Sequence, residues 1–222
     1  MKQLYIEQKI KIFEKQEKLF EKMFKEHNMT NSKKAMEIAK RVHKGVRKDK
    51  TPEITHMFNV AERMLKMVIG RFDIKRVDEL VASAFLHDTI EDCKDKYSES
   101  DLKKDFNKSV NDNVLQMSKK DGFEKNDEDR KEYYDNMMLD ASLLKSEDRI
   151  ENLSTMTEVF SLNKKFDYLE ESINYIIPML EKHSEIALNK KDYIEFYIIK
   201  ESINKLMLQT EYLKYYLNVE KN

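Results

Sequence analysis

Residues that form tight turns are scarce in this chain, which has 3 Gly and 2 Pro among 222 residues. A β-sandwich or β-barrel needs many tight turns, and those turns depend on glycine and proline. Apolar residues recur at intervals of three and four along most of the sequence, as they do on one face of an α-helix. We therefore predict an all-α fold, and at this length a single domain with a small appendage.

Composition restricts the class of partner. Lys and Arg number 41 against 42 Asp and Glu, so no overall basic field favours nucleic acid. No window approaches the roughly 20 apolar residues of a membrane span, and the first twenty residues lack the apolar core of a signal peptide. Cys93 is the one cysteine, which excludes an internal disulfide and fits a reducing compartment. We predict a cytoplasmic protein that binds neither nucleic acid nor membrane.

The first 30 residues are predicted to form an amphipathic N-terminal helix that ends before Asn28. Its apolar stripe comprises Leu4, Ile10, Phe13, Phe20, Met23 and Phe24. This stripe either packs on the rest of the domain or forms a contact between copies of the chain. Residues 31–222 would then form the main domain, including the C-terminal helices.

Helix boundaries follow from caps and periodicity. We expect Asn31 or Ser32 to cap a second helix and Thr55 to cap a third. Further helices are predicted over 75–86, 100–106, 111–117, 132–144, 147–160, 166–183 and 192–217. Pro178 should kink or break its helix, and the polar stretch 119–130 is predicted to be an exposed loop.

The predicted helix over 75–86 is almost wholly apolar from Val81 to Leu86, yet it ends in His87, Asp88, Glu91 and Asp92. A solvated helix terminus is one explanation. However, three carboxylates so close together repel one another unless a cation or a proton lies between them. An adjacent imidazole and carboxylate can also bind one divalent ion.

Four blocks of the sequence resemble, in order, the motifs of the HD-type hydrolase domain of RelA/SpoT homologues, which include stand-alone small alarmone hydrolases. These blocks are Arg47-Lys48, His56, the run 87–92, and Asp148-Arg149 with Asn152. The family motifs read as an Arg-Lys loop followed by His-Pro, His-Asp-X-X-Glu-Asp, and Leu-Ala-Asp-Arg-X-X-Asn. The similarity extends loosely over residues 35–180.

The resemblance implies an HD-type helical fold that holds one Mn²⁺ ion. The implied ligands are His56, His87, Asp88 and Asp148. Two imidazoles and two carboxylates suit manganese, iron or zinc. Glu91 and Asp92 match the family's acidic pair, which orients or deprotonates the attacking water.

The resemblance also implies a nucleotide substrate. Arg47 and Lys48 match the family's basic pair that faces substrate, Asn152 matches its contact to the nucleotide, and Lys145 occupies a position where a lysine is common. The implied reaction is hydrolysis of the 3'-pyrophosphate of (p)ppGpp to GDP or GTP and pyrophosphate. The synthetase domain of the long homologues needs well over another hundred residues, so we expect hydrolase activity alone.

The sequence departs from the family at Met57, at Glu53, and at Ser146-Glu147, where the family has Pro, a frequent Tyr and Leu-Ala. If Glu53 faces the substrate, it weakens affinity for highly charged alarmones. Two further hypotheses therefore stand beside the first: an HD phosphohydrolase acting on another nucleotide, such as one with a 3'-phosphate, and an inactive HD domain that binds a nucleotide or a protein. His43 is interpreted as a structural residue or as a support for the site.

Overall fold

The computed structural model describes residues 2–119, 123, 126–156 and 160–220. Every regular element in these ranges is helical, and the one β-bridge is an isolated pair, Val46 and Pro52. The all-α prediction is therefore confirmed. The chain divides into two compact units, Met1–Ser118 and Lys119–Asn222. The predicted division at residue 30 stays a prediction.

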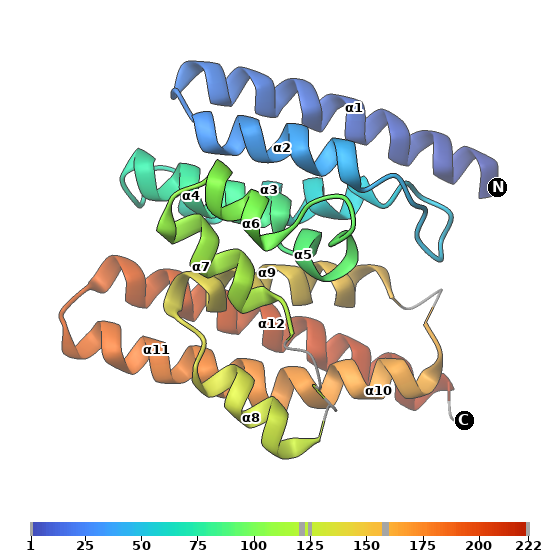
Figure 1. Cartoon of the computed structure of the whole chain (residues 1–222). Helices are drawn as coiled ribbons and strands as arrows, with labels where there is room; N and C mark the ends of the chain where they lie inside the picture. The colour runs from blue at the N-terminus through green and yellow to red at the C-terminus, as the bar shows by residue number, and fades with distance from the viewer. Residues whose placement is uncertain (1, 120–122, 124–125, 157–159, 221–222) are drawn as a thin grey trace. The chain divides into compact units, whose positions relative to one another are not determined.

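The first unit contains seven helices within its described residues (Figure 1): α1 Lys2–Glu26, α2 Thr30–Val42, α3 Ile54–Val68, α4 Ile74–Leu86, α5 Thr89–Asp92, α6 Glu99–Asp105 and α7 Lys108–Met117. Helices α2, α3 and α7 all pack against α4. Every residue of α4 from Val77 to Leu86 is buried. The central place of α4 agrees with the nearly continuous apolar run from Val81 to Leu86 in its second half.

Three phenylalanines of the apolar stripe of α1 pack inside the first unit, whereas Ile10 is exposed. Phe20 and Phe24 are buried, and the ring of Phe13 contacts that of Phe58 on α3. Phe20 contacts both Phe58 and Phe85 of α4, and Phe24 also contacts Phe85. The N-terminal helix therefore stabilises the two helices that carry the histidines described below. An oligomer formed through α1 stays a prediction.

The N-terminus of α2 is capped from elsewhere in the sequence. The predicted caps Asn31 and Ser32 are wrong, because α2 already begins at Thr30 and the preceding Met29 makes no side-chain cap. Instead, the carboxylate of Asp78 on α4 accepts hydrogen bonds from the backbone N–H groups of Asn31 and Ser32, at 3.0 and 2.7 Å. A carboxylate at this position also complements the helix dipole.

The second unit is built, in its described part, from α8 Asp127–Asp135, α9 Leu139–Thr155, α10 Leu162–Glu171, a π-helical turn η1 Ser172–Ile176, α11 Ile177–Asn189 and α12 Tyr193–Glu220. Helix α12 packs against α9, α10 and α11. The predicted break near residue 145 is wrong, since α9 is continuous and the break lies at 136–138. None of the described helices combines the length and apolar composition required to cross a bilayer.

Two other boundaries differ from the prediction. The stretch 119–130 is not all loop, because α8 begins at Asp127 and the Asn126 side chain accepts a hydrogen bond from the backbone N–H of Asp129. Residues 120–122 and 124–125 of this stretch lie outside the described residues. Pro178 is the second residue of α11, which directly follows η1. The change of helix type before Pro178 accommodates the missing N–H without interrupting the helix.

Candidate metal centre and anion-binding cavity

His56 lies in the first turn of α3 and is buried. Thr55 does not cap this helix, contrary to the prediction, because α3 starts at Ile54 and Glu53 is the preceding residue. The Thr55 hydroxyl instead donates a hydrogen bond to the carbonyl of Pro52, at 2.7 Å. This bond ties the loop that enters α3 to the turn that carries His56.

His87 directly follows α4 and is fully buried. Its Nδ1 lies 2.8 Å from the backbone carbonyl of Ala84, and this nitrogen must be the donor because a carbonyl can only accept. The neutral ring therefore carries its lone pair on Nε2, as metal-binding histidines do. The rings of His56 and His87 meet edge to face, with centroids 5.2 Å apart.

The carboxylate of Asp88 faces both imidazoles. Its Oδ2 lies 3.1 Å from Nε2 of His87 and 3.9 Å from Nε2 of His56. With Nδ1 of His87 donating to Ala84, a neutral His87 would set a nitrogen lone pair against a carboxylate oxygen. Two such atoms repel at this distance unless a proton or a metal cation lies between them. The arrangement therefore suits a bound cation.

Glu91 and Asp92 lie on the short α5 and keep part of their side chains exposed. Partial burial, followed by the negative charges of Asp88 and Glu91, raises the pKa of Asp92 to about 6. A carboxyl group with such a pKa exchanges protons near neutral pH. Asp92 thus has the acid–base property that the handling of a water molecule requires.

His43 connects the end of α2 to α5. Its Nε2 lies 3.1 Å from Oγ1 of Thr89, and its Nδ1 lies 3.6 Å from both Sγ of Cys93 and Oε1 of Glu53. Burial lowers the pKa of His43, although Glu53 and then Asp88 oppose this shift. His43 therefore holds the turn that contains Asp88 and Thr89, in keeping with a supporting role.

Glu53 is directed toward His43 and toward Gly45. The backbone N–H of Gly45 donates to Oε2 of Glu53, at 3.3 Å. A Cβ atom at residue 45 would lie 2.8 Å from this oxygen, so a larger residue there would displace the flexible end of the Glu53 side chain. These contacts account for one of the departures from the family pattern, because the Glu53 carboxylate has partners within its own loop.

The basic pair Arg47 and Lys48 lies in the loop between α2 and α3. The backbone N–H of Arg47 donates to the carbonyl of Thr51, and Lys50 adopts a left-handed conformation with φ of 72° to close the turn. Arg47 is half-buried and Lys48 is exposed. Both cations are thus presented on the segment that leads into His56.

Asp148 lies on α9 of the second unit, between Lys145 and Asn152. The Asn152 amide donates to its Oδ1 at 2.7 Å, and Nζ of Lys145 lies 3.4 Å from its Oδ2. The spacings of three and four residues place all three side chains on one face of α9. Burial alone would lower the pKa of Lys145, but Tyr133 and Asp148 raise it well above its ordinary value. Lys145 therefore remains a cation beside Asp148.

A cavity of about 340 Å³ opens next to Asp148 within the second unit. Five cationic side chains and three carboxylates line it, together with Asn152, Ser161, Asn163 and Tyr168. The cations are Lys119, Arg130, Lys145, Arg149 and Lys164, and the carboxylates belong to Asp148, Asp167 and Glu171. This excess of positive charge suits an anionic ligand.

Tyr168 adds an aromatic wall to this cavity. The guanidinium of Arg149 lies 4.2 Å from the centre of its ring, and Nζ of Lys164 lies 5.4 Å from it. Sequence reasoning missed Lys164, Tyr168 and Arg130. The available signal was weak: a lysine and a tyrosine four residues apart on a polar helix.

A buried ion pair fixes the floor of the cavity. Arg149 binds the carboxylate of Glu171 and the backbone carbonyl of Tyr168, so it joins α9 to α10. Tyr134 donates a hydrogen bond to the same carboxylate, at 2.8 Å. Burial would raise the pKa of Glu171, but the charge of Arg149 and its hydrogen bond, together with Lys145, lower it to about 2.

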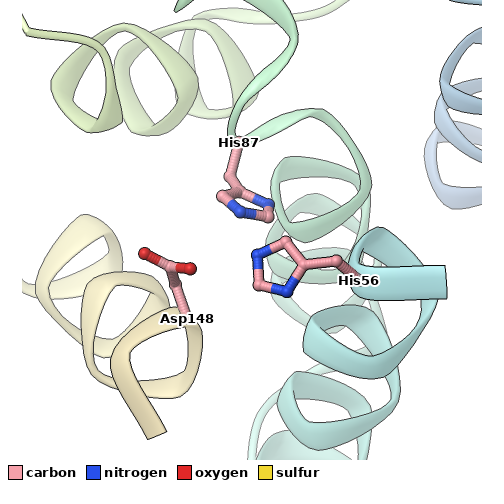
Figure 2. A group of neighbouring side chains, drawn as sticks. All are labelled: His56, His87 and Asp148. Carbon is pink, nitrogen blue, oxygen red and sulfur yellow. The ribbon is translucent and has the colours of Figure 1, made fainter. Parts of the chain in front are cut away.

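Figure 2 shows His56 on α3, His87 at the end of α4 and Asp148 on α9, each with one candidate ligand atom. The histidines and Asp88 belong to the first unit, whereas Asp148 belongs to the second. A centre with all four ligands would draw on both units. No model of a known protein family matches the sequence, and no curated protein matches it.

Proposed function

We propose that the chain is an HD-type, metal-dependent phosphohydrolase that acts on a phosphorylated nucleotide. The single observation that carries this proposal is the distance of 3.1 Å between Nε2 of His87 and the carboxylate of Asp88. The hydrogen bond from Nδ1 of His87 to Ala84 leaves the opposite nitrogen to act as a ligand. A divalent cation relieves the repulsion between these two electron-rich atoms.

The donor set fits one divalent ion. His56, His87 and Asp88 would hold it from the first unit, and Asp148 would join them from the second. Two imidazole nitrogens and two carboxylate oxygens suit Mn²⁺, and also iron or zinc. Asn152 and Lys145 would hold the Asp148 carboxylate in place. When bound, the ion would lower the pKa of a water molecule and polarise a phosphate oxygen.

Glu91 and Asp92 would orient this water and take its proton. The pKa of Asp92, raised to about 6, supports this role because a base works best when its pKa lies near the working pH. Positive charge from a bound ion lowers the pKa of a neighbouring carboxyl, so Asp92 would be ionised at neutral pH and ready to accept a proton.

The cavity beside Asp148 supports the proposal of an anionic substrate that carries a planar ring. Lys119, Lys145 and Lys164 would bind phosphate oxygens, and Tyr168 would stack on a base. Arg47 and Lys48 would supply further positive charge from the first unit. We propose (p)ppGpp as the nucleotide and its 3'-pyrophosphate as the group that is released.

The metal site is tested by Mn²⁺ titration followed by electron paramagnetic resonance. His87→Ala and Asp148→Asn should each weaken Mn²⁺ binding by about 100-fold or more, whereas the control His27→Ala, at an exposed histidine of the first unit, should leave it unchanged. If His87→Ala binds Mn²⁺ as the wild type does, the metal-dependent hydrolase is refuted.

The substrate is tested separately with the Mn²⁺-loaded protein. Release of pyrophosphate from ppGpp should exceed release of phosphate from GTP and from a nucleotide with a single 3'-phosphate, compared as kcat/KM. A preference for the 3'-phosphate would replace the alarmone by the second nucleotide class and would keep the hydrolase. Binding of ppGpp with no product from any nucleotide would favour the inactive HD domain.

A further inference from the structure

Two arginines bring buried hydrogen-bond donors to the cavity of the second unit. Arg149 is buried and Arg130 is half-buried, and both line the cavity. The Nε atom of each guanidinium is buried and has no hydrogen-bond acceptor among the residues that the structure describes. An unpaired buried donor costs free energy, and in native proteins such a group is usually satisfied by a water, an ion or a ligand. The proposed function gives Arg130 no role.

The contacts of the two arginines place them at the same end of the cavity. Arg149 binds the carboxylate of Glu171 through Nη2. Cζ of Arg130 lies 6.0 Å from the ring centre of Tyr175, which follows Glu171 by four residues. Tyr134 joins these groups, because its ring stacks on that of Tyr175 with centroids 5.8 Å apart, and its hydroxyl donates to Glu171 at 2.8 Å. Both guanidinium groups therefore lie beside the same pair of stacked tyrosines.

Arg130 is held in place by the start of α8 and by η1. The hydroxyl of Tyr175 on η1 donates to Oδ1 of Asp127, the first residue of α8, at 2.7 Å. Arg130 lies three residues further along α8 and so on the same face of this helix. A guanidinium whose position is fixed in this way loses less conformational entropy when it binds a ligand.

The charge and size of the cavity indicate which ligand these donors would bind. Its five cationic side chains and three carboxylates leave two positive charges in excess. Guanidinium N–H groups match the oxygens of a phosphate group, which can accept two parallel hydrogen bonds. The volume of about 340 Å³ lies at the lower end of pockets that hold small-molecule ligands, and it exceeds the space that one phosphate group fills. A diphosphate group would use both this space and donors from two helices.

We propose that Arg130 and Arg149 bind a diphosphate group in this cavity without a metal ion, and that Arg130 sets the preference for a diphosphate over a single phosphate. Arg149 supplies its Nε–H while its other nitrogens stay on Glu171 and on the Tyr168 carbonyl. Arg130 supplies a second Nε–H and a positive charge. This inference rests on the proposed function in one respect, because a diphosphate is the group that the proposed reaction releases. The binding itself requires neither the metal nor the first unit.

The test is calorimetric titration of the full chain with inorganic pyrophosphate in the presence of EDTA. The wild type should bind pyrophosphate at least about 10-fold more tightly than inorganic phosphate. Arg130→Gln should weaken pyrophosphate binding by about 10- to 100-fold, since it removes charged hydrogen bonds. The control Lys190→Gln, at an exposed lysine that follows α11, should leave the affinity unchanged. Arg130→Lys keeps the charge without the fork of N–H groups and should recover only part of the affinity.

Urea unfolding separates lost binding from a lost fold. Pyrophosphate should raise the urea midpoint of the wild type and of Lys190→Gln, but not that of Arg130→Gln. If Arg130→Gln does not fold, Arg130→Lys carries the test and must bind pyrophosphate more weakly than the wild type.

Three results would overturn the proposal: a wild type that binds no pyrophosphate in EDTA, equal affinity for phosphate and pyrophosphate, or a folded Arg130→Gln that binds pyrophosphate as the wild type does. None of them bears on the Mn²⁺ titration of His87→Ala. Failure of this inference is therefore distinguishable from failure of the metal-dependent hydrolase.

Discussion

Replacing Glu171 by Gln should destabilise the second unit more than any other single charge removal near the cavity. Glutamine preserves the shape of the side chain and can still accept a hydrogen bond, so the substitution removes mainly the charge. The remaining Arg149 would be a cation whose side chain is 4% exposed and whose main counter-charge is lost. Breaking a buried pair in this way is costly because an uncompensated charge stays buried.

The magnitude follows from the pKa of Glu171, which is about 2 in the folded chain against an ordinary value of 4.5. A difference of about 2.5 pKa units corresponds to about 3 kcal/mol of unfolding free energy. Because the folded pKa is the lower one, this contribution is fully present above pH 4.5. It should decline as the pH falls from 4.5 towards 2, since the carboxyl group then becomes protonated in both states.

Urea unfolding followed by tyrosine fluorescence measures the effect. The chain has no Trp, and only Tyr5 and Tyr97 of its 11 tyrosines lie in the first unit, so the signal reports mainly on the second. Glu171→Gln should lower the unfolding free energy by about 3 kcal/mol at pH 7. The control Glu211→Gln removes a carboxylate from an exposed ion pair of the second unit and should cost less than about 0.5 kcal/mol.

The reasoning would be refuted by a cost below about 1 kcal/mol for Glu171→Gln, or by a cost that does not change between pH 7 and pH 3. A double variant separates the charge from the packing. Replacing Arg149 by Met together with Glu171 by Leu should restore most of the stability, because well-packed apolar residues often replace a buried ion pair without loss.

Three further outcomes are expected. Phe20→Ala should lower the unfolding free energy of the first unit by about 3 to 5 kcal/mol in urea titrations, because it leaves a cavity in a buried aromatic cluster. The control Leu19→Ala, at an exposed position, should lower it by less than about 0.5 kcal/mol. In thermal melts of the metal-free protein, Asp92→Asn should be stabilising at pH 7.5 but not at pH 4. The raised pKa of Asp92 means that its ionised carboxylate opposes folding above pH 6. Solvent screening limits the gain in unfolding free energy to about 1 kcal/mol. His43→Ala and Thr89→Val should each weaken Mn²⁺ binding about tenfold, because each removes the same hydrogen bond between His43 and Thr89. The double variant should therefore bind Mn²⁺ no more weakly than either single variant, and additive losses would contradict this.

Much of the secondary structure was predictable because helices arise from local patterns. The scarcity of Gly and Pro and the spacing of apolar residues predict an all-α chain, and the apolar run that ends at Leu86 predicts a central helix. The position of His56 in a first turn and of His87 at a helix end follows from the same patterns. Helix ends were less predictable, since Asp78 caps α2 from 46 residues away and no local signal records such a contact.

The sequence by itself determined which side chains are available: two histidines near helix ends, a run of carboxylates, and a balanced surface charge. Only the tertiary structure decided what these side chains contact. Packing sets Nδ1 of His87 on the Ala84 carbonyl, directs Glu53 to His43, and gathers Arg130, Lys164 and Tyr168 around Asp148. Periodicity assigns a residue to a face of its own helix, whereas the partner of that face depends on how distant helices pack.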